Sequence, residues 1–331
     1  IGIEILEYEK SPISTAMIAI ILGLILGNIF KIREGFLIGL DFTQKYILKL
    51  GIICLGIQLK PFEFIKFGSI AIPLIVVCII SVLVVIKLLI QKLKISRGMS
   101  YLIAIGSTVC GTTAIIATAP VINAKKSEMA YAIANMTVFG ILAMLIYPYF
   151  ANFYFDGDPL FVGLFMGTAI HETSQVAAAG LIYDQQFNSP ETLNIATVTK
   201  LIRNAFLVIM IPLFAYLYNR GQNHTKNYSI INIFPYFVLG FIALIILRNI
   251  GDVFFLQTNI NGEEMWIEFV SLITSSAKIF LSMSMAAVGL STNLKDLKSM
   301  GYKPFIVGFV SLLTVGIVSL TAIQFLSNLT L

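Results

Sequence analysis

A series of ten long hydrophobic segments is the feature that most constrains this chain of 331 residues. Segments of roughly 18 or more apolar residues can cross the hydrocarbon core of a bilayer as helices. The connections between them are mostly short, so no room is left for a soluble domain. The sequence therefore predicts an all-α integral membrane protein, with one polytopic membrane domain over residues 1–331. The segments lie at about 12–30, 37–58, 69–91, 99–122, 128–151, 158–182, 194–218, 230–249, 266–289 and 303–327.

The composition supports this fold class. Apolar residues make up 58% of the chain, charged residues make up 12%, and the mean hydropathy is +0.91. The net charge of +5 reflects basic residues in short loops rather than a basic patch, so nucleic acid is not an expected partner. The three cysteines, Cys54, Cys78 and Cys110, lie in hydrophobic segments and lack the spacing of a disulfide framework or a metal site. We expect the lipid bilayer as the surroundings, and no cofactor or metal.

Two of the segments contain related stretches that are small, hydroxylated and glycine-bearing. One runs from Gly106 to Ala117, and the other runs from Gly167 to Ala178, sixty-one residues further on. Lipid cannot hydrogen-bond free peptide groups, so irregular backbone at membrane depth survives only inside protein or beside a water-filled cavity. Matching interrupted segments in the two halves of a transporter indicate its binding site. We therefore expect two discontinuous or re-entrant helices that meet near the bilayer midplane.

A second internal match indicates that the whole chain is built from two related halves. Gly56 and Gly68 flank a basic amphipathic link that follows a helix, and Gly289 and Gly301 flank a similar link at the same spacing. The predicted halves are about 1–151 and 158–331. Segments two to five would correspond to segments nine, ten, six and seven, and segment one is matched to segment eight only as a guess. An inverted repeat of this kind is typical of secondary transporters.

The distribution of Lys and Arg leaves two topologies open for segments four and six. If all ten segments cross, the basic loop residues divide ten against five between the two sides; if four and six are re-entrant, Lys125 and Lys126 change sides and the division becomes twelve against three. Only the re-entrant arrangement lets both matched pairs of segments obey one twofold axis in the membrane plane. Spanning helices with an unwound centre remain the alternative. The larger group includes Arg220, Lys226, Lys295 and Lys298.

Ionisable and polar residues in these segments are the candidates for binding chemistry. His171 and Glu172 are adjacent, and such groups in a hydrophobic segment normally face a cavity or a partner. Either the pair contacts the substrate or changes charge during a transport cycle, or it is a structural pair bonded to neighbouring backbone. Gln175 lies one helical turn beyond His171 and is a candidate second ligand.

The hydroxyl-rich stretches predict a polar site but not the sign of its ligand. Peptide N–H groups at a half-helix N-terminus bind anions, whereas the same segments with carbonyls foremost would bind Na⁺. The candidate substrate-binding residues in the two stretches are Ser107, Thr108, Cys110, Gly111, Thr112, Thr113, His171, Glu172, Thr173, Ser174 and Gln175.

Lys200 and Arg203 favour an anion. At a spacing of three residues they share one helix face near the start of segment seven. The alternative is a pair that snorkels to the membrane interface. Lys278, in segment nine, is assigned no role and is expected to pair with Glu268 or a lipid headgroup. The acidic residues expected on a solvated loop surface are Asp156, Asp158, Asp184 and Glu191.

Several enzyme classes are excluded by what the motifs lack. His171-Glu172-Thr173-Ser174-Gln175 is not a zincin helix, because Gln175 stands where the second histidine would be. The chain has no phosphate-binding loop, and with His171 and His224 as its two histidines it has no bis-histidine haem site within the hydrophobic segments. We therefore do not expect an enzyme.

Three motifs resemble the YeiH-type bacterial inner-membrane family, which is named for a proposed role in sulfate export. They are Gly106-Ser-Thr-Val-Cys-Gly followed by Ala117-Thr-Ala-Pro-Val-Ile, then Ala169-Ile-His-Glu-Thr-Ser-Gln-Val-Ala-Ala-Ala-Gly180, then Ala286-Ala-Val-Gly-Leu-Ser-Thr. The resemblance covers nearly the whole chain in the same order. It implies a transporter with inverted repeats, similar to bile-acid symporter and cation/proton antiporter folds. Family members usually begin with an extra hydrophobic segment, so a further N-terminal helix is left open.

Together these features predict a secondary active transporter of a small anion, sulfate or a related oxyanion, in the bacterial inner (plasma) membrane. We expect coupling to H⁺ or Na⁺ and alternating access, and we leave a homodimer open. A cation/proton antiporter is the alternative within transport. The alternative outside transport is a membrane enzyme or sensor, for which Cys110 would have to face His171.

Overall fold

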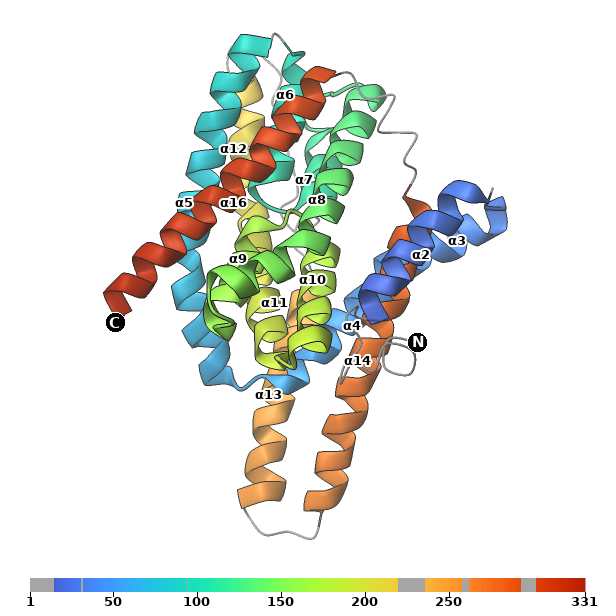
Figure 1. The fold of residues 1–331 in the computed structure, drawn as a ribbon, viewed down its shortest axis with the longest axis vertical. Helices are drawn as coiled ribbons and strands as arrows, with labels where there is room; N and C mark the ends of the chain where they lie inside the picture. The colour runs from blue at the N-terminus through green and yellow to red at the C-terminus, as the bar shows by residue number, and fades with distance from the viewer. Residues whose placement is uncertain are drawn as a thin grey trace.

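The computed structural model describes residues 15–30, 32–93, 95–219, 236–257, 262–292 and 302–330. These residues are almost all helical, and none of them lies in a β-strand (Figure 1). The structure therefore confirms the predicted all-α class. Among the residues discussed above, Arg220, His224, Lys226, Lys295, Lys298 and Gly301 lie outside the described ranges.

Six helices in the described residues are long and apolar enough to cross a membrane, over residues 61–89, 127–154, 190–218, 237–255, 263–291 and 305–328. The sequence predicted ten segments of spanning length, and hydropathy alone did not reveal which of them are divided. The continuous helices, or pairs of helices, that supply the six spans are α5 (Pro61–Leu93), α8 (Lys126–Tyr154), α11 (Pro190–Ala205) with α12 (Leu207–Asn219), α13 (Phe237–Gly251), α14 (Glu263–Ser291) and α16 (Tyr302–Thr330).

The other four predicted segments are short or interrupted helices. The first is α2 (Thr15–Ile29), with 15 residues. The second is divided into α3 (Glu34–Phe42), a π-helical stretch (Thr43–Ile47) and α4 (Leu48–Leu55). The fourth predicted segment is broken in the middle into α6 (Arg97–Thr108) and α7 (Gly111–Thr118). The sixth is broken into α9 (Pro159–Ala169) and α10 (Thr173–Phe187).

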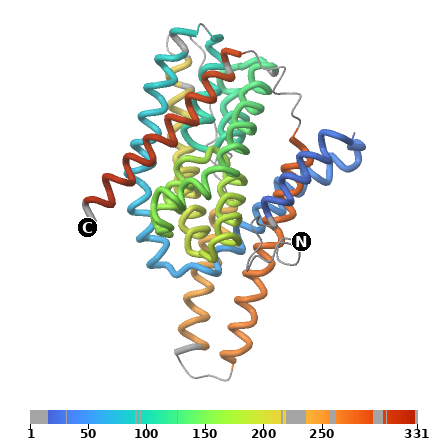
Figure 2. Tube along the Cα trace, viewed as in Figure 1, coloured from blue at the N-terminus to red at the C-terminus, as the bar shows by residue number. Residues whose placement is uncertain are grey.

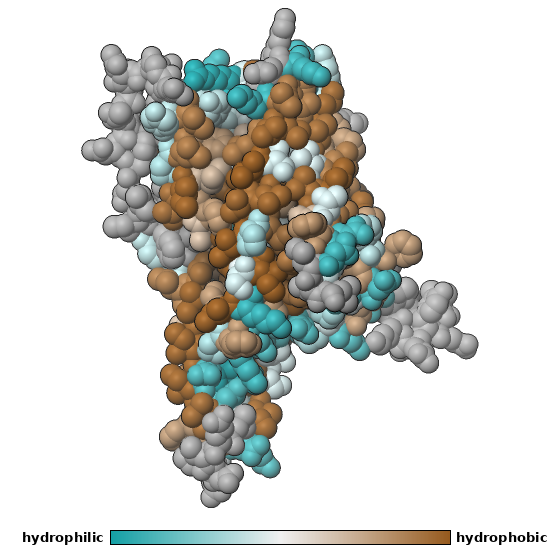
Figure 3. Space-filling view, turned by 90° about the vertical axis from the view of Figure 1, so that its left-hand side faces the viewer, coloured by the Kyte–Doolittle hydropathy of each residue, from teal (hydrophilic) through white to brown (hydrophobic). Residues whose placement is uncertain are grey.

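The outer surface of the long helices is apolar, as a bilayer requires. Exposed isoleucines occur along their outward faces, among them Ile65, Ile80, Ile146, Ile279 and Ile317. Apolar surface in water costs about 25 cal/mol per Å², so a surface of this extent would not be stable in solution. Hydrophobic side chains cover most of the upper part of the face shown in Figure 3, and hydrophilic ones gather at its top and below its middle.

The helices form two groups that lie side by side (Figures 1 and 2). One group contains α5 to α12 and α16, and the other contains α2 to α4, α13 and α14. In the second group α2 and α14 touch through their backbones: a Cβ atom on Gly23 would lie 2.8 Å from the carbonyl oxygen of Ala286, and one on Gly289 would meet that of Ile20. The glycines of α2 therefore form a close helix-packing face, as small residues do in membranes.

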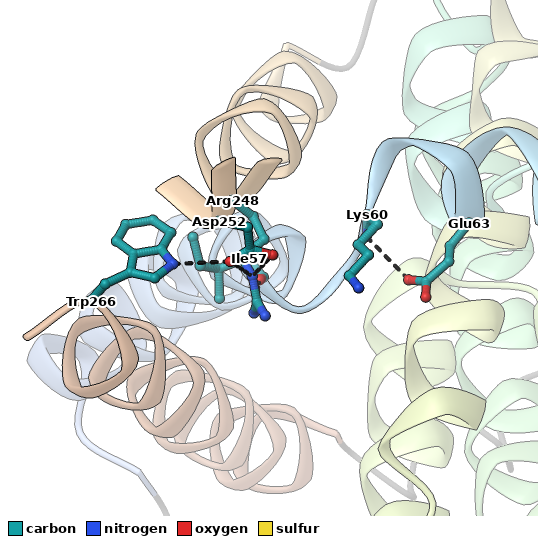
Figure 4. Close-up of polar contacts among 6 residues, drawn as sticks. All are labelled: Ile57, Lys60, Glu63, Arg248, Asp252 and Trp266. Atoms are coloured by element: carbon teal, nitrogen blue, oxygen red, sulfur yellow. Dashed lines mark hydrogen bonds and ion pairs between the residues drawn. The ribbon is translucent and has the colours of Figure 1, made fainter. Parts of the chain in front are cut away.

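A polar cluster joins α13 to α14 and to the turn after α4 (Figure 4). The Arg248 Nε atom donates to both carboxylate oxygens of Asp252, at 2.7 and 2.8 Å, and Nη1 donates to the Ile57 carbonyl at 3.1 Å. Trp266 donates from its indole nitrogen to Asp252 at 3.0 Å. Nearby, at the start of α5, Glu63 accepts a hydrogen bond from the Lys60 backbone. The charge of Arg248 is thus matched within the protein.

An ion pair between α10 and α14 corrects two expectations. The Lys278 Nζ atom lies 2.7 Å from an Asp184 carboxylate oxygen, and the Asp184 side chain is only 5% exposed. The predictions that Asp184 lies on a solvated surface and that Lys278 pairs with Glu268 or a headgroup were wrong. The reason is that α10 continues to Phe187, which places Asp184 on a buried helix face. This pair connects the two helix groups.

Candidate functional site

The two matching stretches are the places where helices break, as predicted. The first helix ends at Thr108 and resumes at Gly111. The second ends at Ala169 and resumes at Thr173. Each break leaves backbone N–H and C=O groups without intrahelical partners, because the ends of any helix do so. The site is built from what satisfies those groups.

Each broken pair of helices returns to the end of the molecule at which it began. Next to the start of α6, the Ser96 hydroxyl donates to Glu128 in the first turn of α8 at 2.6 Å. At the opposite end of α8, Tyr183 of α10 donates to Asn152 at 2.8 Å. Since α8 has 29 residues, these two regions lie about 40 Å apart. The two hairpins therefore enter from opposite ends of α8 and point toward each other.

The tips of the two hairpins are in contact. The Gly111 N–H donates to the His171 carbonyl at 3.2 Å. The Thr112 N–H donates to the Glu172 Oε1 atom at 3.2 Å, and the Thr112 hydroxyl donates to the same oxygen. The Cys110 sulfur lies 3.4 Å from the Thr173 hydroxyl oxygen. The sequence stretches predicted to meet thus do meet.

Lys200 lies directly behind these tips and binds both breaks. It is 0% exposed, and its Nζ atom donates to the carbonyls of Val109 at 3.0 Å, Ile170 at 2.9 Å and His171. Three donated bonds require the ammonium form and use all its hydrogens. A cation here compensates the partial negative charge at the C-termini of α6 and α9. The alternative that this lysine snorkels to the interface is wrong, because the side chain is fully buried.

Arg203, one turn further along α11, binds the same two helix ends. It is 1% exposed and donates from Nε to the Thr108 carbonyl at 2.9 Å and from Nη2 to the Ser107 carbonyl at 2.6 Å. Its Nη1 atom donates to the carbonyl of Thr168. The planar guanidinium thus satisfies carbonyls from both broken helices at once, through three separate nitrogen atoms. The interface alternative is wrong for Arg203 as well.

Glu172 lies at the opposite, electropositive ends of the breaks. It is the N-cap residue of α10, and its own N–H donates to the Gln175 side chain at 3.2 Å. Its carboxylate accepts from Thr112 and so caps the N-terminus of α7. Anions are stabilised at such helix ends. Glu172 therefore occupies the position that a bound anion would take.

The remaining predicted site residues differ in whether their polar side chains are already bonded within the protein. The hydroxyls of Ser107 and Thr108 bond to carbonyls within their own helix. The Gln175 amide is held by the Thr137 carbonyl at 3.3 Å, so it supports Glu172 rather than standing free. Thr113 is exposed and Ser174 is half-buried, and neither is among the residues that bond the two tips together.

Two buried side chains at the tips retain polar atoms without partners. His171 is 1% exposed, and neither of its ring nitrogens has a hydrogen-bond partner in the described residues. Asn204, next to Arg203, donates to the Thr173 hydroxyl at 2.9 Å, but its own Oδ1 atom has none in that part of the chain. Such atoms are costly unless water or a ligand binds them. Sequence reasoning missed Asn204, although a polar residue beside two buried cations was a usable signal.

The formal charges at the tips do not cancel. Lys200 and Arg203 supply two positive charges and Glu172 supplies one negative charge, which leaves an excess of one positive charge. The half-helix ends contribute partial charges of both signs and largely cancel one another. A buried uncompensated charge is unfavourable, so the site favours an additional anion.

Comparison with known proteins gives one family and several relatives. The sequence model of the family described as conserved hypothetical protein 698 matches residues 4–308. A UPF0324 membrane protein of Streptococcus agalactiae is 37% identical, over 93% of this chain and 89% of its own length. UPF0324 membrane proteins of Fusobacterium nucleatum (34% identical, over 91% and 88%) and Clostridium tetani (31%, over 93% and 88%) are also similar. No solved structure shows a significant match.

Proposed function

Because this chain belongs to the conserved hypothetical protein 698 family of UPF0324 membrane proteins, in agreement with the YeiH-type resemblance of its motifs, we propose that it is a secondary active transporter of a small anion. It is a multi-pass membrane protein by its helices and its relatives. The solute we propose is sulfate or a related oxyanion. The membrane would be the bacterial plasma membrane, and transport would be coupled to H⁺ or Na⁺.

One observation carries the proposal: two helix breaks meet around an excess positive charge. Lys200 and Arg203 are buried, and they hold the C-termini of the half-helices that end at the breaks. The half-helices that begin there, α7 and α10, point their N-termini at the contact of the tips. Half-helix N-termini that face anionic groups are a recurrent way to bind solutes within a membrane. A purely structural cluster would be expected to contain equal numbers of positive and negative charges, whereas this cluster has two positive charges and one negative charge.

An inverted repeat is the architecture that we propose for these elements. The two hairpins enter from opposite ends of α8, as copies related by a twofold axis in the membrane plane would. A Cβ atom on Gly56 would meet the carbonyl of Phe241 in α13, and one on Gly289 would meet the carbonyl of Ile20 in α2. Because Gly56 and Gly289 are equivalent in the sequence match, α2 and α13 would be equivalent too. This favours ten segments in two related halves.

The arrangement of the two helix groups supports a proposal of alternating access. The group of α5 to α12 and α16 contains the site, and the group of α2 to α4, α13 and α14 lies beside it (Figure 2). Transporters built from repeats expose a central site to one side and then the other by moving one group against the other. We propose the same motion here.

Flux of radiolabelled sulfate into proteoliposomes, with and without a pH or Na⁺ gradient, tests the function. We expect gradient-dependent uptake by the full chain. Lys200→Met should reduce it by about tenfold or more, since it removes a positive charge from the site. The matched control is Lys45→Met, at a surface lysine that is 62% exposed, and it should change uptake less than about twofold. Size-exclusion profiles verify folding. Absence of gradient-dependent flux for every small oxyanion would contradict the proposal.

A cation/proton antiporter is the second candidate, and one observation favours it. The Glu172 carboxylate already fills the N-terminus of α7, and the donors of Lys200 are all engaged by carbonyls. Loss of Na⁺/H⁺ or K⁺/H⁺ exchange in Glu172→Gln but not in Arg203→Ala, with no oxyanion flux, would support it. A membrane enzyme or sensor receives no such support, because the sulfur of Cys110 bonds to the Thr173 hydroxyl.

A further inference from the structure

We propose that Glu172 competes with the substrate anion for the same helix ends, so that a divalent oxyanion binds only when Glu172 takes up a proton. The carboxylate would thus be the coupling residue, and the anion and proton would move together as symport. This inference depends on the proposed function and specifies its coupling ion and the charge class of its substrate.

The competition follows from the bonds that Glu172 makes. Its Oε1 atom accepts from the backbone N–H and the hydroxyl of Thr112 at the start of α7, and Glu172 is itself the N-cap residue of α10. The Thr112 groups are donors that an oxyanion at the N-terminus of α7 would use. An ionised carboxylate and a dianion cannot both occupy them, because like charges in close contact repel strongly. A protonated carboxyl group would accept from these N–H and hydroxyl donors less strongly and could leave them to the anion.

Glu172 is the half-buried acidic group at the contact of the tips. Glu172, Thr173 and Ser174 are half-buried and Thr113 is exposed, whereas Lys200 and His171 are buried. The unpartnered ring nitrogens of His171, which directly precedes Glu172, offer a further polar contact to a bound oxyanion. The other ionisable groups around Glu172 are Lys200 and Arg203 from α11 and Cys110 from the first break.

The charge balance then selects a dianion. With Glu172 ionised, a bound dianion would give the cluster an excess of one negative charge, whereas with Glu172 protonated the two cations match the dianion. A monoanion, by contrast, would match the cluster without any proton. Because unbalanced charge is unfavourable in a site shielded from water, dianion and proton are expected to enter together. The proton comes from water on the entry side and returns to water with the anion on the exit side.

The experiment uses the full chain in liposomes loaded with a pH-sensitive dye. An inward sulfate gradient should acidify the lumen of wild-type vesicles, by about one proton per sulfate ion taken up. Glu172→Gln mimics the protonated state, so it should retain sulfate–sulfate exchange at equal pH but lose the proton movement. Exchange by the wild type should fall as pH rises, and at high pH Glu172→Gln should exchange at least about tenfold faster than the wild type. Glu263→Gln, an exposed Glu at the start of α14, is the matched control and should behave like the wild type.

Two further variants keep the test decisive if the glutamine variant does not fold. Thr112→Val removes one donor from the ionised carboxylate, so it should shift the pH dependence of exchange upward, an effect that a merely structural role would not produce. Glu172→Asp keeps a titratable group and should keep coupled proton movement. Sulfate-driven proton movement in Glu172→Gln, an unshifted profile in Thr112→Val, or wild-type sulfate transport without protons would each overturn the inference while leaving the proposed function intact. Absence of exchange of every small oxyanion by the wild type would overturn the proposed function itself.

Discussion

Gly111 lies where the two interrupted helices touch, and its missing side chain makes that contact possible. A Cβ atom there would lie 2.6 Å from the Glu172 Cγ atom and 3.0 Å from its Oε1 atom. Gly111→Ala should therefore push the tips apart and lower the free energy of unfolding by about 1–3 kcal/mol. The thermal midpoint should fall accordingly, and transport should be reduced. Thermal unfolding in detergent, together with sulfate flux, measures both effects.

Gly35 offers the matched control. It lies in α3, and a Cβ atom there would meet nothing within 4 Å. Gly35→Ala should be neutral or stabilise the protein by up to about 1 kcal/mol, because alanine costs less conformational entropy in a helix. If the two substitutions had the same effect on the thermal midpoint, the close contact at Gly111 would not matter to the fold.

At the scale of single residues, the sequence predicted the positions of the site better than the roles of its side chains. Small and hydroxylated residues within apolar segments indicated both breaks, because backbone in lipid must be satisfied by protein. The partners of Lys200 and Arg203 could not be predicted, since they are backbone carbonyls exposed only when α6 and α9 end. Nor could the sequence show that Glu172 caps a helix sixty residues away. Carbonyl partners and long-range caps depend on tertiary placement.

At the scale of elements, the ion pair between α10 and α14 allows an asymmetric prediction. The Asp184 side chain is 5% exposed and that of Lys278 is 39% exposed. Lys278→Met leaves an almost fully buried carboxylate unpaired and should cost about 1–3 kcal/mol of stability, whereas Asp184→Asn leaves a lysine that is partly exposed and should cost less. The double substitution should recover at least half of the loss caused by Lys278→Met.

Thermal unfolding of the two single variants and the double variant measures this coupling as a double-mutant cycle. The control is the exposed pair of Lys45 and Asp41, for which Lys45→Met should change stability by less than about 0.5 kcal/mol. Additive effects of the Lys278 and Asp184 substitutions would show that the pair contributes nothing to the contact between α10 and α14.

Hydropathy predicted where most helices lie, but not how they are divided. Long apolar runs gave α5, α8, α14 and α16 because a continuous span needs little besides length and apolar side chains. Hydropathy did not predict the π-helical stretch at 43–47 or the continuation of α10 through Asp184, since helix type does not alter hydropathy and the continuation is largely polar. The predicted segment ended at residue 182, whereas α10 continues to Phe187, and Asp184 within this continuation pairs with Lys278 of α14.

At the scale of the whole molecule, alternating access requires the two helix groups to move relative to each other. Asp184 and Lys278 face each other across the boundary between the groups, whereas Asn28 of α2 donates to the Thr292 carbonyl at the end of α14, within one group. In a background with Cys54, Cys78 and Cys110 replaced, cysteine pairs at 184/278 and at 28/292 can each be joined by a short thiol cross-linker. The two pairs thus compare a bond between groups with a bond inside one group.

A cross-link between the groups should reduce sulfate flux by about tenfold or more, and reduction of a cleavable linker should restore it, because a site held in one orientation cannot release solute on the other side. A cross-link within the second group should change flux less than about twofold, since that group would move as a unit. Equal inhibition by both cross-links would show that α2 to α4, α13 and α14 do not move as one rigid unit. Full flux with 184 and 278 joined would mean that the anion crosses the membrane without separation of α10 and α14. The parts that move against each other would then both have to lie within the group that contains the helix breaks.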